Sequence, residues 1–357
     1  MRARDLDIEI GRLLLGPHDA ITDVAGVRVG HTTLIEGEAV RTGVTVVYPH
    51  DGNPGTDPVF AGCHRLNGNG ELTGLEWVRE SGLLTTPIGI TNTLSVGIVR
   101  DAIAAAWIDE THAFDWSLPV VGETWDGFLN DTAGQHVTAE HTRQALAAAQ
   151  SGPVDEGNVG GGTGMICHGF KGGIGTASRV VAAESGGYTV GVLVQANHGA
   201  RERFRVNGLP VGEAIGDRVP LPHRQEVSRG GSIIVVVATD APILPGQCDR
   251  LAQRAALGIG RAGGMGEHSS GDLILAFATG NRGLGDLVRM PVDRLTIDLE
   301  AVVHGRINAL FEAVIDATEE AILNALLAAE TMTGRDGNTV HALEADLLVE
   351  TLARLEA

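Results

Sequence analysis

The sequence predicts an α/β protein in which sheets and helices are stacked in layers. Three observations favour this class. Short runs of β-branched residues, such as residues 233–237, alternate with longer segments of helical spacing. Some of these strands are joined by glycine-rich turns that are typical of hairpins. Hydrophobic residues make up 43% of the 357 residues, which is an ordinary share for a globular protein with a large core.

The composition also limits the kind of partner. The formal net charge of −19 argues against a nucleic-acid partner, because phosphate binding needs clustered Lys and Arg. No apolar segment is long enough for a signal peptide or a membrane span, so no membrane partner is expected. The three cysteines, Cys63, Cys167 and Cys248, are widely spaced, odd in number and lack a C-x-x-C pattern, so we expect reduced thiols in a cytoplasmic protein.

The first half of the chain is expected to form strands, then helices separated by loops. The predicted strands are 24–33 and 43–49, and the predicted helices are 72–81, 98–111 and 139–152. Helix 72–81 should end at Gly82, and helix 139–152 at a glycine of its own. The stretch 121–138 is polar, aromatic and poorly periodic, so we expect a loop that carries a functional site.

The second half begins with the glycine-rich segment 157–179 and a hairpin over 180–197 that turns at residues 185–187. Residues 198–231 are polar and dotted with proline, which predicts a linker. The remaining elements are expected at 232–239 (strand), 245–261 (helix), 271–281 (strand), 296–329 (helix) and 341–355 (helix).

The glycine-rich segment 157–179 resembles a phosphate-binding loop only superficially. Lys171 is followed by Gly172 rather than by Ser or Thr, and the spacing does not match a dinucleotide-binding fingerprint. We therefore favour glycines that permit close packing and a turn. A second interpretation is that they let the backbone approach a substrate or Gly231.

Histidines and serines suggest two further kinds of site. His136 and His141 are five residues apart, and no H-E-x-x-H or zinc-type cluster occurs, so no metal is predicted. His268 lies near Ser269, Ser270 and Asp272, which leaves a Ser-His-Asp hydrolase as a less favoured alternative, since G-x-S-x-G is absent.

Ser232 stands between two glycines and a β-branched strand, in the sequence GGSIIVVV. It could simply begin the strand. The functional alternative is an N-terminal nucleophile: if the Gly231–Ser232 bond breaks, the Ser232 hydroxyl lies beside a free α-amine. Such an amine has a pKa of about 7.7–8.0 and can act as a base near neutral pH. Gly231 suits this cleavage because it has no side chain to obstruct the attack.

These residues lie among motifs that closely resemble the DmpA-type aminopeptidases, which include the L-aminopeptidase/D-amidase/D-esterases and the β-peptidyl aminopeptidases. The resemblance covers nearly the whole chain and is carried by TDVAGVRVGHTT, GETWDGFLND, GGTGM, FKGGIGTASR, VGVLVQAN, GGSIIVVVATDAPILP, SSGDLILAFATGN and AAETMTGRDGNTV. It implies a four-layer αββα sandwich of the type shared with the ornithine acetyltransferases. It also implies self-cleavage into a larger chain, 1–231, and a smaller chain, 232–357, which form one structural domain and assemble as a homo-oligomer.

The resemblance assigns a role to each matching residue. Ser232 would be the nucleophile, and Asn197 would donate its amide to the oxyanion. Ser270 and Asp272 would orient the amine and hydroxyl of Ser232. Glu123 would bind the ammonium group of the substrate. No metal ion or organic cofactor is expected.

Two positions depart from the family pattern. Asp272 stands where a glutamate is expected, so its carboxylate reaches about one methylene less far. Phe128, expected at the substrate site, replaces a tyrosine of some relatives, so an extra hydroxyl near the oxyanion is missing.

The function predicted from these residues is a self-processing serine aminopeptidase or amidase. It would release N-terminal amino acids from short peptides, amides or esters through an acyl-enzyme. Two alternatives are a related acyltransferase of the ornithine acetyltransferase type, in which a threonine would be expected in place of Ser232, and an unprocessed binding protein on the same scaffold. The preferred first residue, its chirality and its α or β character depend on loops that the sequence does not position.

Overall fold

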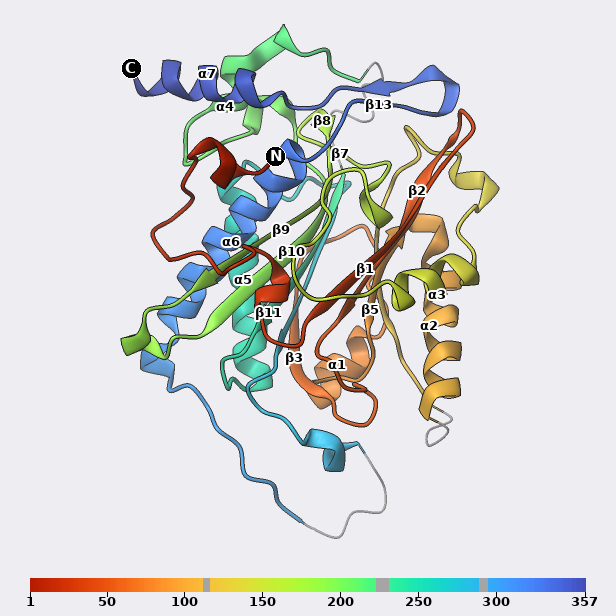
Figure 1. Cartoon of the computed structure of the whole chain (residues 1–357), viewed down its shortest axis with the longest axis vertical. Helices are drawn as coiled ribbons and strands as arrows, with labels where there is room; N and C mark the ends of the chain where they lie inside the picture. Colours follow the sequence, from red (N-terminus) through yellow and green to blue (C-terminus); the bar gives the residue numbers. More distant parts are fainter. Residues whose placement is uncertain (112–115, 223–230, 289–294) are drawn as a thin grey trace.

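A computed structural model describes residues 1–111, 116–222, 231–288 and 295–357. Its elements form four layers, with one pair of helices outside each of two stacked sheets (Figure 1). Helices α5 (Pro245–Arg261) and α6 (Asn308–Leu327) cover the larger sheet, and α2 (Val96–Thr111) and α3 (Ala139–Ala147) cover the smaller one. The expected αββα sandwich is confirmed.

The smaller sheet has four strands in the order β1 (Arg28–Glu36), β2 (Val40–Tyr48), β5 (Ile88–Asn92) and β6 (Val120–Thr124). Neighbouring strands are antiparallel except for the parallel pair β5–β6. Because β6 is parallel to β5, its last residues emerge at the same end of the sheet as those of β5. Glu123 lies in this part of β6, opposite Thr91 of β5.

The larger sheet has six strands in the order β4 (Leu83–Leu84), β3 (Val59–Gly68), β12 (Gly271–Ala278), β11 (Ser232–Thr239), β10 (Thr189–Asn197) and β9 (Gly173–Val180). Strands β11 and β12 are parallel and are connected through α5, whereas the other neighbours are antiparallel. The central position of β11 explains its composition. Ile234 and Val236 face the other sheet, while Ile233 and Val235 face the helices, so both faces must be apolar.

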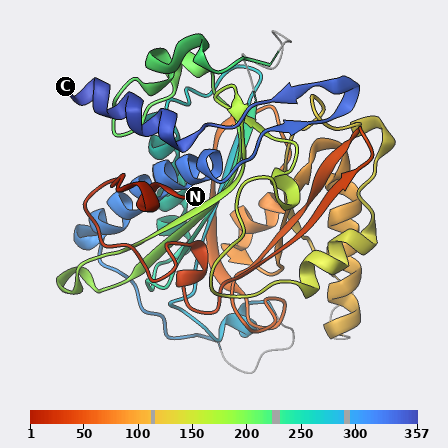
Figure 2. The ribbon, with the colours of Figure 1, turned by 45° about the horizontal axis from the view of Figure 1, so that its top comes forward.

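The remaining elements lie at the margins of the sandwich. They are α1 (Leu75–Ser81), α4 (Val211–Ile215), α7 (Ala345–Glu356), and the short hairpins β7 (Ile166–Cys167) with β8 (Phe170–Lys171) and β13 (Met332–Thr333) with β14 (Thr339–Val340). The β13–β14 hairpin reaches away from the C-terminal helix to the far end of β1 and β2 (Figure 2). There the guanidinium of Arg41 donates to the carbonyl of Thr333 (2.9 Å).

Several elements differ from the sequence prediction in their bounds. Helix α3 ends at Ala147, before the expected glycine. Helix α6 begins at Asn308 rather than at 296, because the segment before it is held in a non-helical path: the Val302 amide donates to the Pro242 carbonyl, and Val303 is exposed. The expected loop 121–138 starts within β6.

The glycine-rich segment contains β9 and packs closely, as predicted. A Cβ at Gly175 would lie 2.0 Å from the carbonyl oxygen of Ala321 in α6. A Cβ at Gly161 would lie 2.2 Å from Oε1 of Gln195 and 2.7 Å from the carbonyl oxygen of Ile90. These glycines therefore let helix α6 and the two sheets approach each other.

The segment predicted as a linker, 198–231, is packed in the part that the structure describes. Phe204, Val206 and Val211 are buried in the core between the larger sheet and its helices. Residues 223–230, including Gly230 before the predicted cleavage site, lie outside the described residues. Among the described residues, no helix has the length and apolar character needed to cross a membrane. The homo-oligomeric state and the cytoplasmic location stay predictions.

Candidate active site

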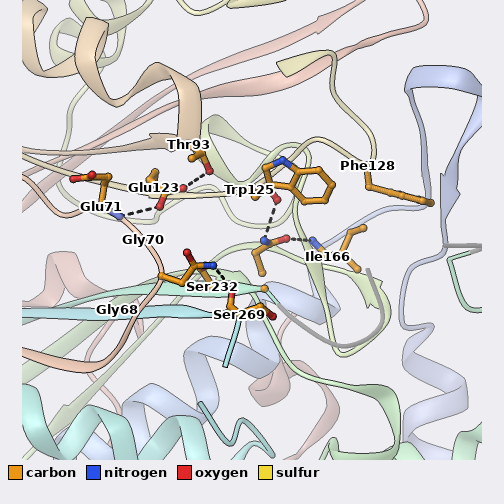
Figure 3. A pocket seen from close by; sticks show the side chains of 13 residues that line it. Gly68, Gly70, Glu71, Thr93, Glu123, Trp125, Phe128, Ile166, Ser232 and Ser269 are labelled. Carbon is orange, nitrogen blue, oxygen red and sulfur yellow. Dashed lines mark hydrogen bonds between the residues drawn. The ribbon is translucent and has the colours of Figure 1, made fainter. Parts of the chain in front are cut away.

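A cavity of about 570 Å³ lies where the end of β10 meets the start of β11. Side chains from both sheets line it (Figure 3). Glu71, Thr93 and Glu123 lie on one side, and Trp125, Phe128 and Ile166 lie on the other, with Ser232 between the two groups. The full lining consists of Gly68, Asn69, Gly70, Glu71, Thr93, Glu123, Trp125, Phe128, Ile166, Asn197, Gly231, Ser232 and Ser269.

Ser232 is the first residue of β11 and lies directly opposite Asn197, the last residue of β10. Side chains of directly opposed residues lie on the same face of a sheet, with their Cβ atoms about 4.5–5.5 Å apart. Gly231, just before Ser232, has φ of +146°. A Cβ there would lie 1.9 Å from the carbonyl oxygen of Asn197, so only glycine fits.

The side-chain amide of Asn197 is held at both ends. Its Oδ1 accepts a hydrogen bond from the Ile166 backbone N–H (2.8 Å), and its Nδ2 donates to the Trp125 carbonyl (3.0 Å). These two bonds determine which end of the amide is nitrogen. One of the two Nδ2 hydrogens is left to donate to a ligand in the cavity.

Ser232 is connected to Ser270 and Asp272 through the backbone between them. The Gly271 N–H donates to Ser232 Oγ (3.0 Å), and the Ser270 hydroxyl donates to Asp272 Oδ1. The parallel pairing of β11 with β12 creates this proximity, because it aligns Ile233 with Asp272. The resemblance grouped Ser232, Ser270 and Asp272, but the Gly271 donor is not apparent from residue types, since any residue could supply a backbone N–H.

Asp272 is buried, with 1% of its surface exposed. Burial raises the pKa of its carboxyl to about 6, although the bond from Ser270 favours the ionised form. The pairing of β12 with β3 shifts register between Asp272 and Leu273, where β3 contributes Leu66 as an extra residue. The strand register thus shifts beside Asp272, the position at which the family resemblance predicts the longer side chain of a glutamate.

Glu123 is also buried, with 3% exposed. Its Oε1 accepts from the Glu71 backbone N–H (2.9 Å), and its Oε2 accepts from the Thr93 hydroxyl. Burial raises the pKa of this carboxyl, and the two hydrogen bonds partly oppose that change. Among the described residues, the partners of this carboxylate include no cationic side chain, so it is well suited to bind a cation in the cavity.

A sequence model described as peptidase family S58 matches residues 19–340, which is most of the chain. The chain belongs to peptidase family S58. Two curated relatives are named beta-peptidyl aminopeptidase BapA. The protein of Sphingosinicella microcystinivorans is 48% identical over 360 residues, covering 96% of this chain and 89% of its own length. The protein of Sphingosinicella xenopeptidilytica is 44% identical over 371 residues, covering 98% of this chain and 90% of its own length.

Solved structures agree with this S58 assignment. A beta-aminopeptidase of Burkholderia sp. has a TM-score of 0.95 at 55% sequence identity, covering 100% of this chain and 99% of its own. The L-aminopeptidase D-Ala-esterase/amidase of Ochrobactrum anthropi, described as a variant of the Ntn hydrolase fold, has a TM-score of 0.90 at 43% identity, and 99% of each chain is covered. This S58 peptidase is accordingly a hydrolase of the N-terminal-nucleophile type and an aminopeptidase.

The loop after β6 supplies the apolar side of the S58 cavity. Phe128 is buried, with 2% exposed, and its phenyl ring carries no hydroxyl that could donate to a ligand. Its carbonyl accepts from Nδ2 of Asn338 in the β13–β14 connection (2.9 Å), and the Leu129 carbonyl accepts from the Arg335 N–H (2.8 Å). A hairpin more than 200 residues away in sequence therefore holds this loop.

Other residues considered from the sequence lie elsewhere. His268 is exposed and does not line the cavity, so the cavity lining offers no support for a Ser-His-Asp arrangement. His136 pairs with Asp131 on the surface (3.1 Å). Sequence reasoning also missed Thr93 and Trp125, which contact Glu123 and Asn197. Trp125 lies within the GETWDG motif, which could have singled it out, but nothing marked the Thr93 hydroxyl.

Proposed function

We propose that this S58 aminopeptidase activates itself by cleaving the Gly231–Ser232 bond, and that Ser232 then removes the first residue from short peptides, amides or esters. The observation that carries this proposal is the shared cavity of Ser232, Asn197 and Glu123. A nucleophile, an amide donor and a carboxylate for the substrate ammonium are thereby available to one bound molecule.

Self-cleavage begins when Ser232 Oγ attacks the carbonyl carbon of Gly231. The peptide bond is converted to an ester on Oγ, the Ser232 nitrogen becomes an amine, and water hydrolyses the ester. A side chain at position 231 would collide with the Asn197 carbonyl oxygen and displace the carbonyl that is attacked. Gly231 avoids this collision and so favours the attack. The product carries a hydroxyl and an α-amine on the same residue.

In turnover, the α-amine of Ser232 accepts the hydroxyl proton while Oγ attacks the first peptide carbonyl of the substrate. The Gly271 N–H, which donates to Oγ, stabilises the negative charge that develops there. The remaining hydrogen of Asn197 Nδ2 donates to the oxyanion. The protonated amine then transfers its proton to the leaving amine, and water hydrolyses the acyl-enzyme. Ser270 and Asp272 act as positioning residues behind this amine.

Glu123 restricts the enzyme to the N-terminus of its substrates. Its carboxylate pairs with the substrate ammonium, and this charge-assisted contact places the adjacent carbonyl at Ser232. A β-amino acid puts one additional methylene between the ammonium and the carbonyl. The names of both BapA relatives and of the Burkholderia structure support β-amino acids among the accepted first residues.

Gel electrophoresis under denaturing conditions and N-terminal sequencing test the self-cleavage. The purified protein should yield a smaller fragment that begins at Ser232, and a Ser232→Ala variant should remain intact and inactive. Hydrolysis of β-alanyl and L-alanyl p-nitroanilides then measures both substrate types. An intact wild-type chain without amidase activity would overturn the proposal.

A Glu123→Gln variant tests the binding of the substrate ammonium. It should raise KM strongly for amides with a free amine, while hydrolysis of an ester that lacks the amine should change little. Equal losses for both substrates would contradict the role proposed for Glu123.

A further inference from the structure

A cluster of one thiol and two imidazoles directly follows two residues of the cavity lining, Ile166 and Asn197, along the chain. Cys167, His168 and His198 are buried, and one donor atom of each lies within 4.8 Å of the others. Among the described residues, no other set of three or more His, Cys, Asp or Glu side chains has donor atoms close enough to bind one metal ion. The mechanism proposed above uses none of these three side chains.

The hydrogen bonds of the cluster leave buried imidazole nitrogens without partners. His168 Nδ1 lies 3.2 Å from the Ala200 carbonyl oxygen, which can only accept, so Nδ1 carries the proton. His168 Nε2 is then a bare lone pair, and no residue in the described part of the chain forms a hydrogen bond with it. His198 Nε2 also has no hydrogen-bond partner among the described residues, and it carries the ring proton when Nδ1 acts as the ligand. A metal-binding histidine usually donates a hydrogen bond from one ring nitrogen to a backbone carbonyl and binds the metal with its other nitrogen. His168 has this arrangement.

The distance between the other two side chains also suits a metal. Cys167 Sγ lies 3.7 Å from His198 Nδ1. Typical bonds of about 2.3 Å from metal to sulfur and about 2.0 Å to nitrogen, at the ~120° angle of a three-coordinate centre, separate these atoms by about 3.7 Å. Without a metal, the Cys167 thiol can instead donate an S–H···N hydrogen bond to His198 Nδ1 over the same distance.

The surroundings favour a monovalent ion. The guanidinium of Arg201 donates to the His168 carbonyl (3.0 Å), and the buried amine of Lys171 also acts on the Cys167 thiol. The one carboxylate that acts on this thiol, Glu267, is paired with Arg203 (3.3 Å), so uncompensated positive groups already lie beside the cluster. A Cu⁺ ion bound to one thiolate and two neutral imidazoles has no net charge, whereas Zn²⁺ with the same ligands has a charge of +1. Burial of an uncompensated charge is costly. Thiolate and imidazole both bind copper, and thiolate is a preferred ligand of Cu⁺.

We propose that Cys167, His168 and His198 form a binding site for a thiophilic metal ion, and that the site prefers Cu⁺ to Zn²⁺. Binding breaks the Cys167 S–H bond, forms a metal–sulfur bond and releases one proton to solvent. The metal does not change its oxidation state in this step. The test of this site measures metal content rather than activity, so failure of either proposal leaves the other unaffected.

Metal content tests this proposal without reference to activity. Because the site is buried, the full chain is expressed in medium supplemented with copper or zinc and purified without oxygen. After gel filtration, elemental analysis should find about one copper per chain and less zinc. Copper loading should also raise Tm. The proposal would be overturned if the wild type contained no more copper per chain than Cys167→Ala. It would also be overturned if the wild type retained zinc in preference to copper.

Two variants make the result specific. His168 has φ of +50°, a conformation that asparagine tolerates well, so His168→Asn removes one ligand while preserving the turn. It should lose both the copper and the increase in Tm, even if Cys167→Ala does not fold. Cys248→Ala removes a buried thiol outside the cluster, whose Sγ lies 3.8 Å from the Phe60 carbonyl oxygen, and should retain copper. Equal copper loss in Cys248→Ala and Cys167→Ala would show non-specific binding and contradict the site.

Discussion

Asn197 and Ser232 lie directly opposite each other in the antiparallel β10–β11 pair, and both line the same cavity. Their distance is thus determined by strand register rather than by a flexible loop. The amide of Asn197 is oriented in turn by the Ile166 N–H and the Trp125 carbonyl. This preorganised pair is the basis of the first prediction.

An Asn197→Asp variant should lower kcat by about 10²–10³-fold with little change in KM. The new carboxylate can still accept from Ile166 but cannot donate to an oxyanion. The measurement uses material that gel electrophoresis shows to be fully cleaved. Asn308→Asp, which changes an exposed asparagine at the start of α6, is the control for added charge. An unchanged kcat in Asn197→Asp would contradict the proposed role.

A Thr93→Val variant should raise the pKa of Glu123 further, since it removes a hydroxyl that stabilises the carboxylate. The pH below which KM for a free-amine substrate rises should therefore move upward. The pH dependence of KM for an amino-acid amide measures this. Thr351→Val changes a buried threonine whose hydroxyl has no hydrogen-bond partner among the residues that the structure describes, and it should match the wild type. Identical profiles for Thr93→Val and wild type would be inconsistent with the Thr93 contact.

An Asp126→Asn variant should change how stability depends on pH. Asp126 is fully buried, and burial raises the pKa of its carboxyl to about 6. A raised pKa means that its stabilising contribution is complete below about pH 4 and is lost as the pH rises through about 6. The variant should thus gain up to about 3 kcal/mol at pH 8, but not at pH 4.

Thermal unfolding at pH 4 and pH 8 measures this difference. Asp298→Asn, at an exposed position, controls for the loss of a surface charge. A stability change in Asp126→Asn that is the same at both pH values would mean that ionisation of the buried carboxyl is not its cause.

A Gly334→Ala variant should disturb the cavity from a distance. The added Cβ would lie 2.1 Å from the Leu129 carbonyl oxygen, although φ at Gly334 is an ordinary −137°. Displacement of the loop that carries Phe128 should lower kcat/KM by up to about 10²-fold. Gly305→Ala, where the added Cβ has open space, should have no effect. Equal values for both variants would argue against a role of the hairpin in positioning the loop.

A Gly231→Ala variant should slow self-cleavage by about 10²-fold, because a side chain at φ +146° and against Asn197 displaces the reacting carbonyl. A time course on a denaturing gel gives the rate. The cleaved fraction should retain wild-type kcat, since residue 231 is not part of the reaction after cleavage. Cleavage at the wild-type rate would show that glycine is not required there.

Much of the fold was predictable because its signals are local. The run 232–239 predicted a strand with the observed bounds, and 245–261 did the same for α5. Gly82 ends α1 with φ of +71°, as expected of a glycine in that position. Helix α6 was predicted to start too early, since apolar spacing alone does not reveal that the Val302 amide is bonded to Pro242.

Only part of the candidate site was predictable from the sequence. Motifs identified Ser232, Asn197 and Glu123, because side chains with distinctive chemistry occur in recognisable surroundings. The Gly271 donor, the Thr93 hydroxyl and the Asn338 contact were missed. Each depends on a partner distant in sequence, and residue type alone does not distinguish them from ordinary backbone, threonine and turn residues.

The sequence by itself determined the layered α/β class, the family resemblance and the residues at which chemistry is expected, because these depend on local pattern and residue type. Only the tertiary structure decided how they are combined. Strand register brings Asn197 opposite Ser232, a parallel pairing brings Asp272 beside Ile233, and β6 presents Glu123 to the same cavity from the other sheet. It also brings Cys167 and His168 of the β7–β8 hairpin next to His198, which follows the end of β10, and their spacing in the chain does not reveal this. Such contacts join distant segments, and the packing of the whole chain determines them.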